Sequence, residues 1–275
     1  MCGRYTVTRQ DRIAEEFGAV LGDAEQSAWW KPRFNVAPTQ PAPVIVAAAP
    51  ARGGPGAPAA AAPAAPARKI ELMRWGLVPH WAGPGGKAAP LMINARVESL
   101  DAKPMFRDAL HRRRCLVPAD GFFEWLRDAK AGSKAKPQPI YMHPASRRLI
   151  AFAGLWAWHR PRGASRASGG AAGEDARTWP ADDETLSFTI ITGTPNELVR
   201  AYHDRMPLVL DPAAYAAWLD PATPGEAAYA LLRTPPVGDW IAERVSTAVN
   251  SAARDEPDCI APLAAAAPAQ QSLFD

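Results

Sequence analysis

Proline, glycine and small residues divide this chain into short segments and limit what it can fold into. The 275 residues include 29 prolines and 20 glycines. Three tracts made mostly of Ala, Pro, Gly, Ser and Gln lie at 49–67, 161–184 and 261–271. Such tracts bury too little apolar surface to offset the entropy of ordering, and proline interrupts helices. We therefore predict one domain over residues 2–260, with low-complexity insertions at 49–67 and 161–184 and a disordered tail at 261–275.

The segments between these tracts are mostly short and strand-like. They are rich in β-branched and aromatic residues and are bounded by Pro, Gly or Asp. The predicted strands span residues 4–7, 44–47, 69–76, 122–125, 140–143, 149–158, 186–191 and 240–245. Because strands outnumber helices and do not alternate regularly with them, the pattern favours a single mixed α+β domain.

Helix starts are predicted from capping residues. Thr8 and Asp11 form a capping-box pattern before the apolar pair Ile13 and Phe17. Further starts, each with Thr or Asp before a proline, are predicted at 194–197, 211–212 and 223–226.

Composition excludes several classes of protein. The formal charge is +3, which is too small to indicate a binder of bulk polyanions. No apolar run reaches about 18 residues, and the first residues lack the apolar segment of a secretory signal, so we expect no membrane span and a cytoplasmic protein. Three widely spaced cysteines predict neither a disulfide scaffold nor a zinc site. The histidines lack metal-ligand spacing, and we expect no metal and no cofactor.

Cys2 follows the initiator methionine directly. Removal of Met1 would leave an α-amine and a thiol on adjacent carbons. The amine, with a pKa near ~7.7–8.0, can condense with an aldehyde, and the thiol can close on the imine to form a thiazolidine. The thiol could instead act as an acyl-transfer nucleophile. Because many chains begin Met-Cys by chance, Cys2 alone does not decide among these readings.

Two polar clusters are candidates for acid/base chemistry. Glu124 lies within Phe-Phe-Glu-Trp, where burial against aromatic residues would raise its pKa. The alternative is that Glu124 faces solvent on an edge strand. His203 begins His-Asp-Arg and is an acid/base candidate, although a histidine at a helix end can serve only the helix dipole.

Three further segments carry polar or aromatic residues. Asn94, Arg96 and Glu98 would share one face of an extended segment, which could equally be its solvated side. Residues 74–81 place two tryptophans near an arginine, a set that can stack an unpaired base or simply fill a core. Residues 34–40 form a loop-like segment that indicates little alone.

The order of these motifs resembles the SOS response-associated peptidase (SRAP) family, the abasic-site processing proteins. The chain carries Met-Cys-Gly-Arg-Tyr at its start and then Asn-Val-Ala-Pro-Thr-Gln, Arg-Trp-Gly-Leu-Val-Pro, Ile-Asn-Ala-Arg, Arg-Cys-Leu-Val-Pro-Ala-Asp-Gly-Phe-Phe-Glu-Trp and His-Asp-Arg-Met-Pro. Residues 245–250 and 258–260 also resemble the C-terminal end of that family. The resemblance covers roughly residues 2–260 outside the low-complexity tracts.

The resemblance implies a compact α+β domain around a curved, barrel-like sheet and a monomer that acts on abasic sites in single-stranded DNA, with single/double-strand junctions as one context. Cys2, freed by self-removal of Met1, would form a thiazolidine crosslink with the abasic aldehyde. Asn94 would orient the Cys2 terminus, Glu124 would act as acid/base, and His203 would protonate the sugar-ring oxygen. A strand-cleaving lyase activity is a further expectation.

The resemblance also implies a set of DNA-binding residues: Arg4, Asn35, Pro38, Arg74, Trp75, Trp81, Arg96 and Thr192. One departure from the family pattern is His80, which stands where a small residue is expected before Trp81. It leaves the shape of the groove there open.

Three other functions compete with this one. An N-terminal-nucleophile amidase also begins Met-Cys-Gly, but no glutamine-binding motif follows. A non-covalent single-strand binder could use the tryptophans together with the basic triplet Arg112–Arg114. A protease acting on other proteins is the third, and self-removal of Met1 explains peptidase chemistry without it.

Overall fold

The structure, a computed structural model, describes residues 2–21, 31–48, 67–79, 91–126, 136–159, 185–233 and 239–263. Nearly all of the predicted insertion at 49–67, the whole of 161–184 and the tail after residue 263 lie outside the described residues. His80 and Trp81 lie outside them as well.

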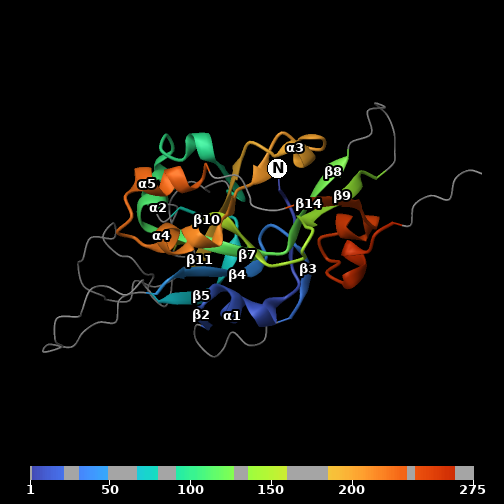
Figure 1. Ribbon diagram of the computed structural model, residues 1–275, viewed down its shortest axis with the longest axis horizontal. Helices are drawn as coiled ribbons and strands as arrows, with labels where there is room; N and C mark the ends of the chain where they lie inside the picture. The colour runs from blue at the N-terminus through green and yellow to red at the C-terminus, as the bar shows by residue number, and fades with distance from the viewer. Residues whose placement is uncertain are drawn as a thin grey trace, which may run out of the picture.

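Two sheets build the domain (Figure 1). The first is antiparallel and five-stranded, in the order β14 (Trp240–Arg244), β9 (Gln138–Pro144), β8 (Gly121–Leu126), β1 (Tyr5–Val7) and β3 (Arg33–Val36). The main path of the second is β12 (Met206–Pro207), β11 (Thr185–Gly193), β10 (Ile150–His159), β7 (Arg114–Ala119), β4 (Pro41–Ala47), β5 (Arg68–Trp75) and β2 (Ala19–Leu21). Two short strands, β13 (Val209–Leu210) and β6 (Asn94–Arg96), attach to β10 and β11 respectively.

A parallel pairing closes part of the second sheet into a barrel. Strand β5 pairs with β11 at Trp75 and Phe188, which joins the two ends of the run β11, β10, β7, β4 and β5. The Trp75 and Phe188 rings stack at 6.4 Å between centroids, and the Tyr5 ring meets Trp75 edge-on at 5.1 Å. These rings are fully buried. Aromatic packing therefore fills the barrel where the chain closes it.

Short helices surround the sheets: α1 (Ile13–Phe17), α2 (Pro104–Arg112), α3 (Glu197–Arg200), α4 (Tyr215–Leu219) and α5 (Gly225–Leu231). Figure 1 shows α2, α4 and α5 grouped at one side of the barrel. The C-terminal segment, with 3₁₀ helices at Thr247–Asn250 and Pro257–Ile260, lies at the opposite side beside β9 and β14. None of the helices within the described ranges is long and apolar enough to cross a membrane.

The eight predicted strands and the α+β class are confirmed, whereas the predicted helix caps are only partly right. Asp211 caps its helix by accepting the Ala213 backbone N–H at 2.8 Å. Near residue 197 the cap is Asn196, two residues later than predicted, and α5 begins without a side-chain cap. The capping box at Thr8 is wrong, because Thr8 donates from both its backbone N and its hydroxyl to Asp120 at 2.6 Å.

Strand β8 separates two packed clusters and thereby positions the site. Side chains alternate along it, so Phe122 packs into the barrel-side core and Phe123 into a second cluster with Tyr141, Val245 and Val249. Its neighbours on either side are β1 and β9. Residues at the end of β8 consequently lie beside the start of the chain.

Candidate functional site

The N-terminal segment runs directly into β1 and is fixed against β8. The backbone N of Phe123 donates to the Arg4 carbonyl at 3.0 Å, and Tyr5 pairs with Phe122. This pairing holds Cys2 in the core, where it is 0% exposed. Its thiol donates to the Arg4 carbonyl over 3.6 Å.

Asn94 holds the Cys2 backbone. It is the first residue of β6, which pairs in parallel with β11 at Ile190. Its Nδ2 donates to the Cys2 carbonyl at 2.7 Å, and the side chain is buried. The Asn94 Oδ1 is also buried and has no hydrogen-bond partner within the described part of the chain. The amide therefore anchors residue 2 and still has an acceptor to offer.

Glu124 is buried on the central strand β8 and is only 3% exposed. The interpretation of Glu124 as a solvent-facing residue on an edge strand is therefore wrong, because β1 and β9 flank it. Burial is the main cause that raises the pKa of Glu124 to about 7, and the Asp204 carboxylate adds to the rise. A carboxyl group with a pKa near neutrality can both give and take a proton at physiological pH.

His203 follows α3 and has two contacts at the same ring nitrogen. Its Nδ1 lies 2.9 Å from Asp204 Oδ1 and accepts the Arg205 backbone N–H at 3.0 Å. Accepting that N–H requires an unprotonated Nδ1, whereas pairing with Asp204 requires Nδ1–H. The contact with the Arg205 N–H suits a neutral ring protonated only at Nε2, and the contact with Asp204 suits a ring protonated at Nδ1. When both nitrogens are protonated, Asp204 is placed to stabilise the charge.

Electrostatic coupling connects these groups. Burial raises the pKa of the Cys2 thiol well above its usual range, and the Glu124 carboxylate raises it further. The Asp204 carboxylate in turn raises the pKa of Glu124. The fold therefore brings together Cys2, Asn94, Glu124 and the His203–Asp204 pair from four distant parts of the sequence. The arrangement offers a nucleophile and an acid/base group that are buried, beside a proton donor at the surface.

Arg205 and Glu98 are site-bordering residues that motif reading did not single out as a pair. The Arg205 guanidinium binds Glu98 through both carboxylate oxygens, at 2.8 and 2.9 Å, and donates to the Thr192 carbonyl at 2.6 Å. Thr192 itself is fully buried, and its hydroxyl donates to the Ala95 carbonyl at 3.5 Å. In the sequence Glu98 stands out only as an acidic residue two positions after Arg96. Its partner Arg205 lies more than a hundred positions away, so no local pattern predicts the pair.

The predicted DNA-binding residues fall into two groups. Arg74 and Arg96 are exposed, Pro38 is half-buried, and Arg4 is half-buried with its Nη1 donating to Asn35 Oδ1 at 3.2 Å and to the Val249 carbonyl at 2.8 Å. These four could reach a ligand at the surface.

Asn35 and Trp75, in contrast, are fully buried. The Asn35 amide donates to three carbonyls of the C-terminal segment, and the Trp75 indole donates to the Ile93 carbonyl at 2.8 Å. Both residues support the fold around the site, and a contact of theirs with DNA stays a prediction.

Two arginines of the basic triplet are structural. Arg114 is 3% exposed and donates to backbone carbonyls, among them that of Trp218, while Arg113 pairs with Asp108. Burial lowers the pKa of Arg114 to about 10, so it keeps its charge at neutral pH. Of the triplet only Arg112 is exposed, which removes the basis for a non-covalent binder built on these three residues.

Comparison with known proteins agrees with the motif order. The family model "SOS response associated peptidase (SRAP)" matches residues 1–252. "Abasic site processing protein YoqW" of Bacillus subtilis is 34% identical over 94% of this chain and 99% of its own length. "Abasic site processing protein HMCES" of Gallus gallus is 29% identical over 96% of this chain and 78% of its length.

A solved structure supports the fold. A crystal structure of a protein from Bacteroides thetaiotaomicron superposes with a TM-score of 0.71 at 19% identity, covering 96% of this chain and 100% of that one. Together with the family match over residues 1–252 and the 34% identical relative, this leads to one conclusion. The chain belongs to the SOS response associated peptidase (SRAP) family.

Proposed function

We propose that this protein senses abasic sites in single-stranded DNA and captures them as a thiazolidine at Cys2, after it has removed its own Met1. The observation that carries the proposal is the surroundings of Cys2: it is held by Asn94 at 2.7 Å and lies within electrostatic reach of Glu124, whose pKa is raised to about 7. The relatives named above, whose names state abasic-site processing, support the DNA lesion as the substrate.

Removal of Met1 comes first, because the nitrogen of Cys2 is an amide until then. Hydrolysis adds one water across the Met1–Cys2 peptide bond, releases methionine and leaves the α-amine on Cys2. Glu124 takes a proton from the attacking water and returns it to the departing amine. A group with a pKa of about 7 is suited to both transfers.

The substrate must then open. An abasic sugar is mostly the closed hemiacetal, and the aldehyde appears only when the bond between C1′ and the ring oxygen breaks. Protonated His203 donates a proton to that ring oxygen as the bond breaks, and the C1′ hydroxyl loses its proton to water as the carbonyl forms. Asp204, 2.9 Å from Nδ1, stabilises the charged imidazole beforehand. Such a positioned acid contributes about 10²–10⁴-fold.

The freed amine of Cys2 next attacks C1′. Glu124 moves a proton from the nitrogen to the oxygen on C1′, and loss of that oxygen as one water gives the imine. The thiol then adds across the C=N bond: sulfur bonds to carbon, and the nitrogen receives the proton, which closes the five-membered ring. Because the pKa of the thiol is raised, the thiol keeps its proton until the imine has formed. Asn94 orients the amine through the Cys2 carbonyl, and its unpaired Oδ1 accepts a hydrogen bond from that amine.

The same imine would also give the protein a strand-cleaving lyase activity. An imine at C1′ makes the C2′ proton acidic, and its loss would expel the 3′ phosphate and cut the strand. Closure of the thiazolidine removes the imine and protects the strand. Arg4, Arg74 and Arg96 hold the flanking phosphates in this proposal, and such contacts give salt-dependent affinity.

A denaturing gel tests the proposal. Wild-type protein is mixed with abasic and with intact single-stranded oligonucleotides, alongside Cys2→Ala. We expect a denaturant-resistant adduct only for wild type with the abasic strand, and weak residual binding by Cys2→Ala. A Cys2→Ala protein that forms the adduct at wild-type yield would refute covalent capture at Cys2.

A further inference from the structure

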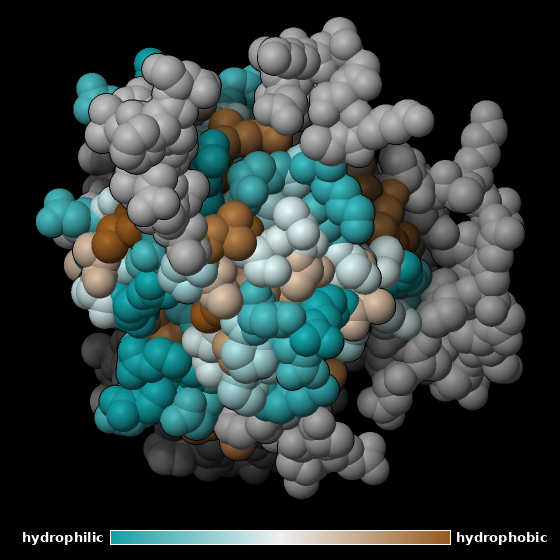
Figure 2. All heavy atoms as spheres, turned by 90° about the vertical axis from the view of Figure 1, so that its right-hand side faces the viewer, coloured by the Kyte–Doolittle hydropathy of each residue, from teal (hydrophilic) through white to brown (hydrophobic). Residues whose placement is uncertain are grey.

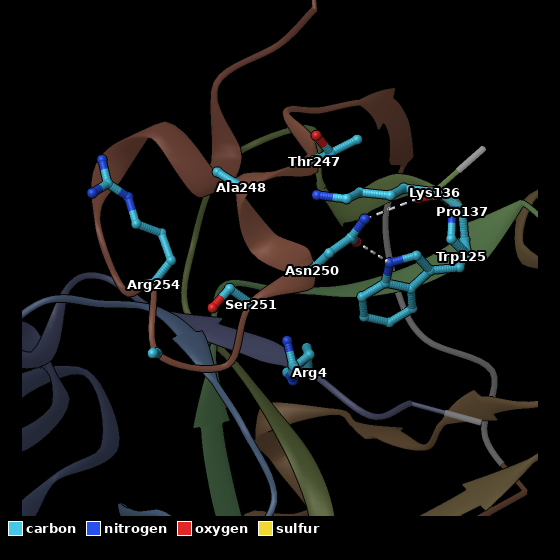
Figure 3. Close-up of a pocket in the computed structure, with 10 residues that line it drawn as sticks. Arg4, Trp125, Lys136, Pro137, Thr247, Ala248, Asn250, Ser251 and Arg254 are labelled. Atoms are coloured by element: carbon cyan, nitrogen blue, oxygen red, sulfur yellow. Dashed lines mark hydrogen bonds between the residues drawn. The ribbon is translucent and has the colours of Figure 1, made fainter. Parts of the chain in front are cut away.

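A large open cleft lies on the other side of strand β8 from Glu124. It has a volume of about 1110 Å³ and is bordered by Arg4, Trp125, Lys136 and the C-terminal segment from Thr247 to Arg254 (Figure 3). Pockets for drug-sized ligands are on the order of 300–1,000 Å³, so one or two nucleotides fit. The catalytic steps above use nothing in this cleft except the neighbourhood of Arg4.

Strand geometry joins the cleft to the reaction centre. The Arg4 carbonyl accepts the Phe123 N–H, so Arg4 lies opposite Phe123, and alternation along β8 puts Trp125 on the same side as both. Glu124 points to the other side, toward Cys2. Arg4 borders the cleft and is only two residues from Cys2. A DNA strand bound covalently at Cys2 therefore lies close to the cleft.

The indole of Trp125 is held in place on the cleft wall. Its Nε1 donates to Asn250 Oδ1 at 2.6 Å, and Asn250 Nδ2 donates to the Pro137 carbonyl at 3.2 Å. Figure 3 shows Asn250 beside Trp125 and Pro137, with a dashed line to each of them. An aromatic ring that is already fixed loses little entropy when a base stacks on it.

The charge of the cleft suits a phosphate backbone. Arg4 and Lys136 both border it, and within the described ranges no carboxylate pairs with either of them. Arg254 points outward in Figure 3 and is paired with Asp258 at 2.8 Å, so we assign it no contact. The hydroxyl groups of Thr247 and Ser251 add neutral donors. Figure 2 shows that the described surface on this side of the molecule is mainly hydrophilic.

We infer that this cleft binds the single-stranded DNA arm that leaves the abasic site on one side, with Trp125 stacking on a base and Arg4 and Lys136 contacting phosphates. The inference rests on the proposed function and adds a second binding site to it. A ring platform beside cations is the arrangement that single-strand binders use without reading sequence. Asn250 is the positioning residue that sets the plane of the platform.

The test uses three single-stranded oligonucleotides that carry an abasic analogue lacking the C1′ hydroxyl, which cannot open to an aldehyde. The lesion stands in the middle, at the 5′ end or at the 3′ end, so the strand has both arms or only one. Affinities of the full chain are measured by fluorescence anisotropy for wild type, Trp125→Ala, Trp125→Phe and Lys136→Glu. Lys103→Glu, an exposed lysine just before α2 on the far side of the barrel, is the charge-matched control.

On the two-armed strand we expect Trp125→Ala to weaken binding by about 5- to 150-fold, with a smaller loss for Trp125→Phe. Lys136→Glu should reduce the slope of log K against log salt by about one. The effects of Trp125→Ala and Lys136→Glu should persist on the one-armed strand whose arm enters the cleft. On the strand that has only the other arm, both effects should vanish. Lys103→Glu should bind all three strands like wild type.

Equal losses on all three strands, or none on any, would overturn the inference. Should Trp125→Ala fail to fold, Trp125→Phe and the exposed Lys136→Glu still decide the matter. An adduct that forms at Cys2 without any arm dependence refutes the cleft alone. Failure to form any Cys2-dependent adduct refutes the proposed function itself.

Discussion

Two neighbouring residues of β8 lie in opposite environments. Glu124 points into a closed, dry region with Cys2 and Asn94, and its pKa is raised to about 7 because burial disfavours its charge. Trp125 points into an open cleft of about 1110 Å³ bordered by cations and hydroxyls. In the proposed function, strand β8 therefore separates the reaction centre from the site that binds DNA. We call the side of β8 with Glu124, Cys2 and Asn94 the closed face, and the side with Trp125 and the cleft the open face. Variants on the closed face should change the rate of reaction, and variants on the open face should change the affinity for DNA.

The largest expected effect comes from Glu124→Gln. Loss of the proton-transferring carboxyl group should slow adduct formation by about 10²–10⁴-fold, without a matching loss of affinity for the unreactive abasic analogue. Because Glu124→Gln should not remove its own Met1, an added methionine aminopeptidase removes Met1 from every variant, and intact mass shows its loss. Single-turnover quenching on denaturing gels then measures the rate.

Glu71→Gln is the matched control for that experiment. Glu71 is a buried carboxylate on β5, paired with Lys69 at 2.7 Å. Its substitution should leave the rate unchanged. A wild-type rate for Glu124→Gln, or an equal loss for Glu71→Gln, would contradict the assignment of acid/base chemistry to the closed face.

The raised pKa of Glu124 should also make the free energy of unfolding depend on pH. The pKa of Glu124 is about 7 in the folded chain and about 4.3 in the unfolded chain, so the folded state holds the proton more tightly. The contribution of Glu124 is therefore lost as pH rises from about 5 to 8, and the free energy of unfolding should fall by up to about 3 kcal/mol. Urea unfolding at several pH values measures this fall. Parallel pH curves for wild type and Glu124→Gln would contradict a shifted Glu124.

Asn94→Leu should have an intermediate effect, again on rate. The substitution keeps the size of the side chain but removes the donor to the Cys2 carbonyl. It also removes the Oδ1 acceptor, which has no partner among the described residues. Poorer orientation of the amine should slow adduct formation about tenfold at saturating DNA. A change in affinity with an unchanged saturating rate would place Asn94 with the binding residues instead.

The smallest expected effect is that of Asn250→Ala on the open face. Without Asn250 the Trp125 indole loses its hydrogen bond and can rotate. DNA must then immobilise the ring on binding, which should weaken the affinity for DNA about two- to tenfold. The rate at saturating DNA should stay at the wild-type value. A slower saturating rate with unchanged affinity would break the separation of the two faces.

Local patterns predicted the strands but not how they close. Each of the eight predicted strands carries its own β-branched and aromatic signature. Strand β3 (Arg33–Val36) was missed, because its segment was interpreted as loop-like. The barrel depends on the parallel pairing of β5 with β11, whose paired residues Trp75 and Phe188 lie more than a hundred positions apart. Nothing within either segment indicates that partner. Similarly, Thr8 has a local capping pattern, but its backbone N–H and its hydroxyl donate instead to the carboxylate of Asp120, which lies on a distant turn.

Sequence motifs identify the residues of the proposed reaction but do not predict their surroundings. Cys2, Asn94, Glu124 and His203 lie in motifs with a recognisable order. The environment of Glu124 depends on β8 being a central strand, which requires β1 and β9 to pair with it. The cleft at Trp125 forms only because the C-terminal segment folds over β8 and β9, held by Asn35 and Arg4. Such long-range packing leaves no local signal.

Intact mass spectrometry of the purified adduct tests the central claim most directly. Covalent capture at Cys2 predicts the mass of the chain without Met1, plus the abasic oligonucleotide, minus one water, with the modified peptide beginning at Cys2. The adduct should persist without borohydride, because a thiazolidine contains no reducible C=N bond. A species that retains Met1, or one that survives denaturation only after borohydride reduction, would contradict the account.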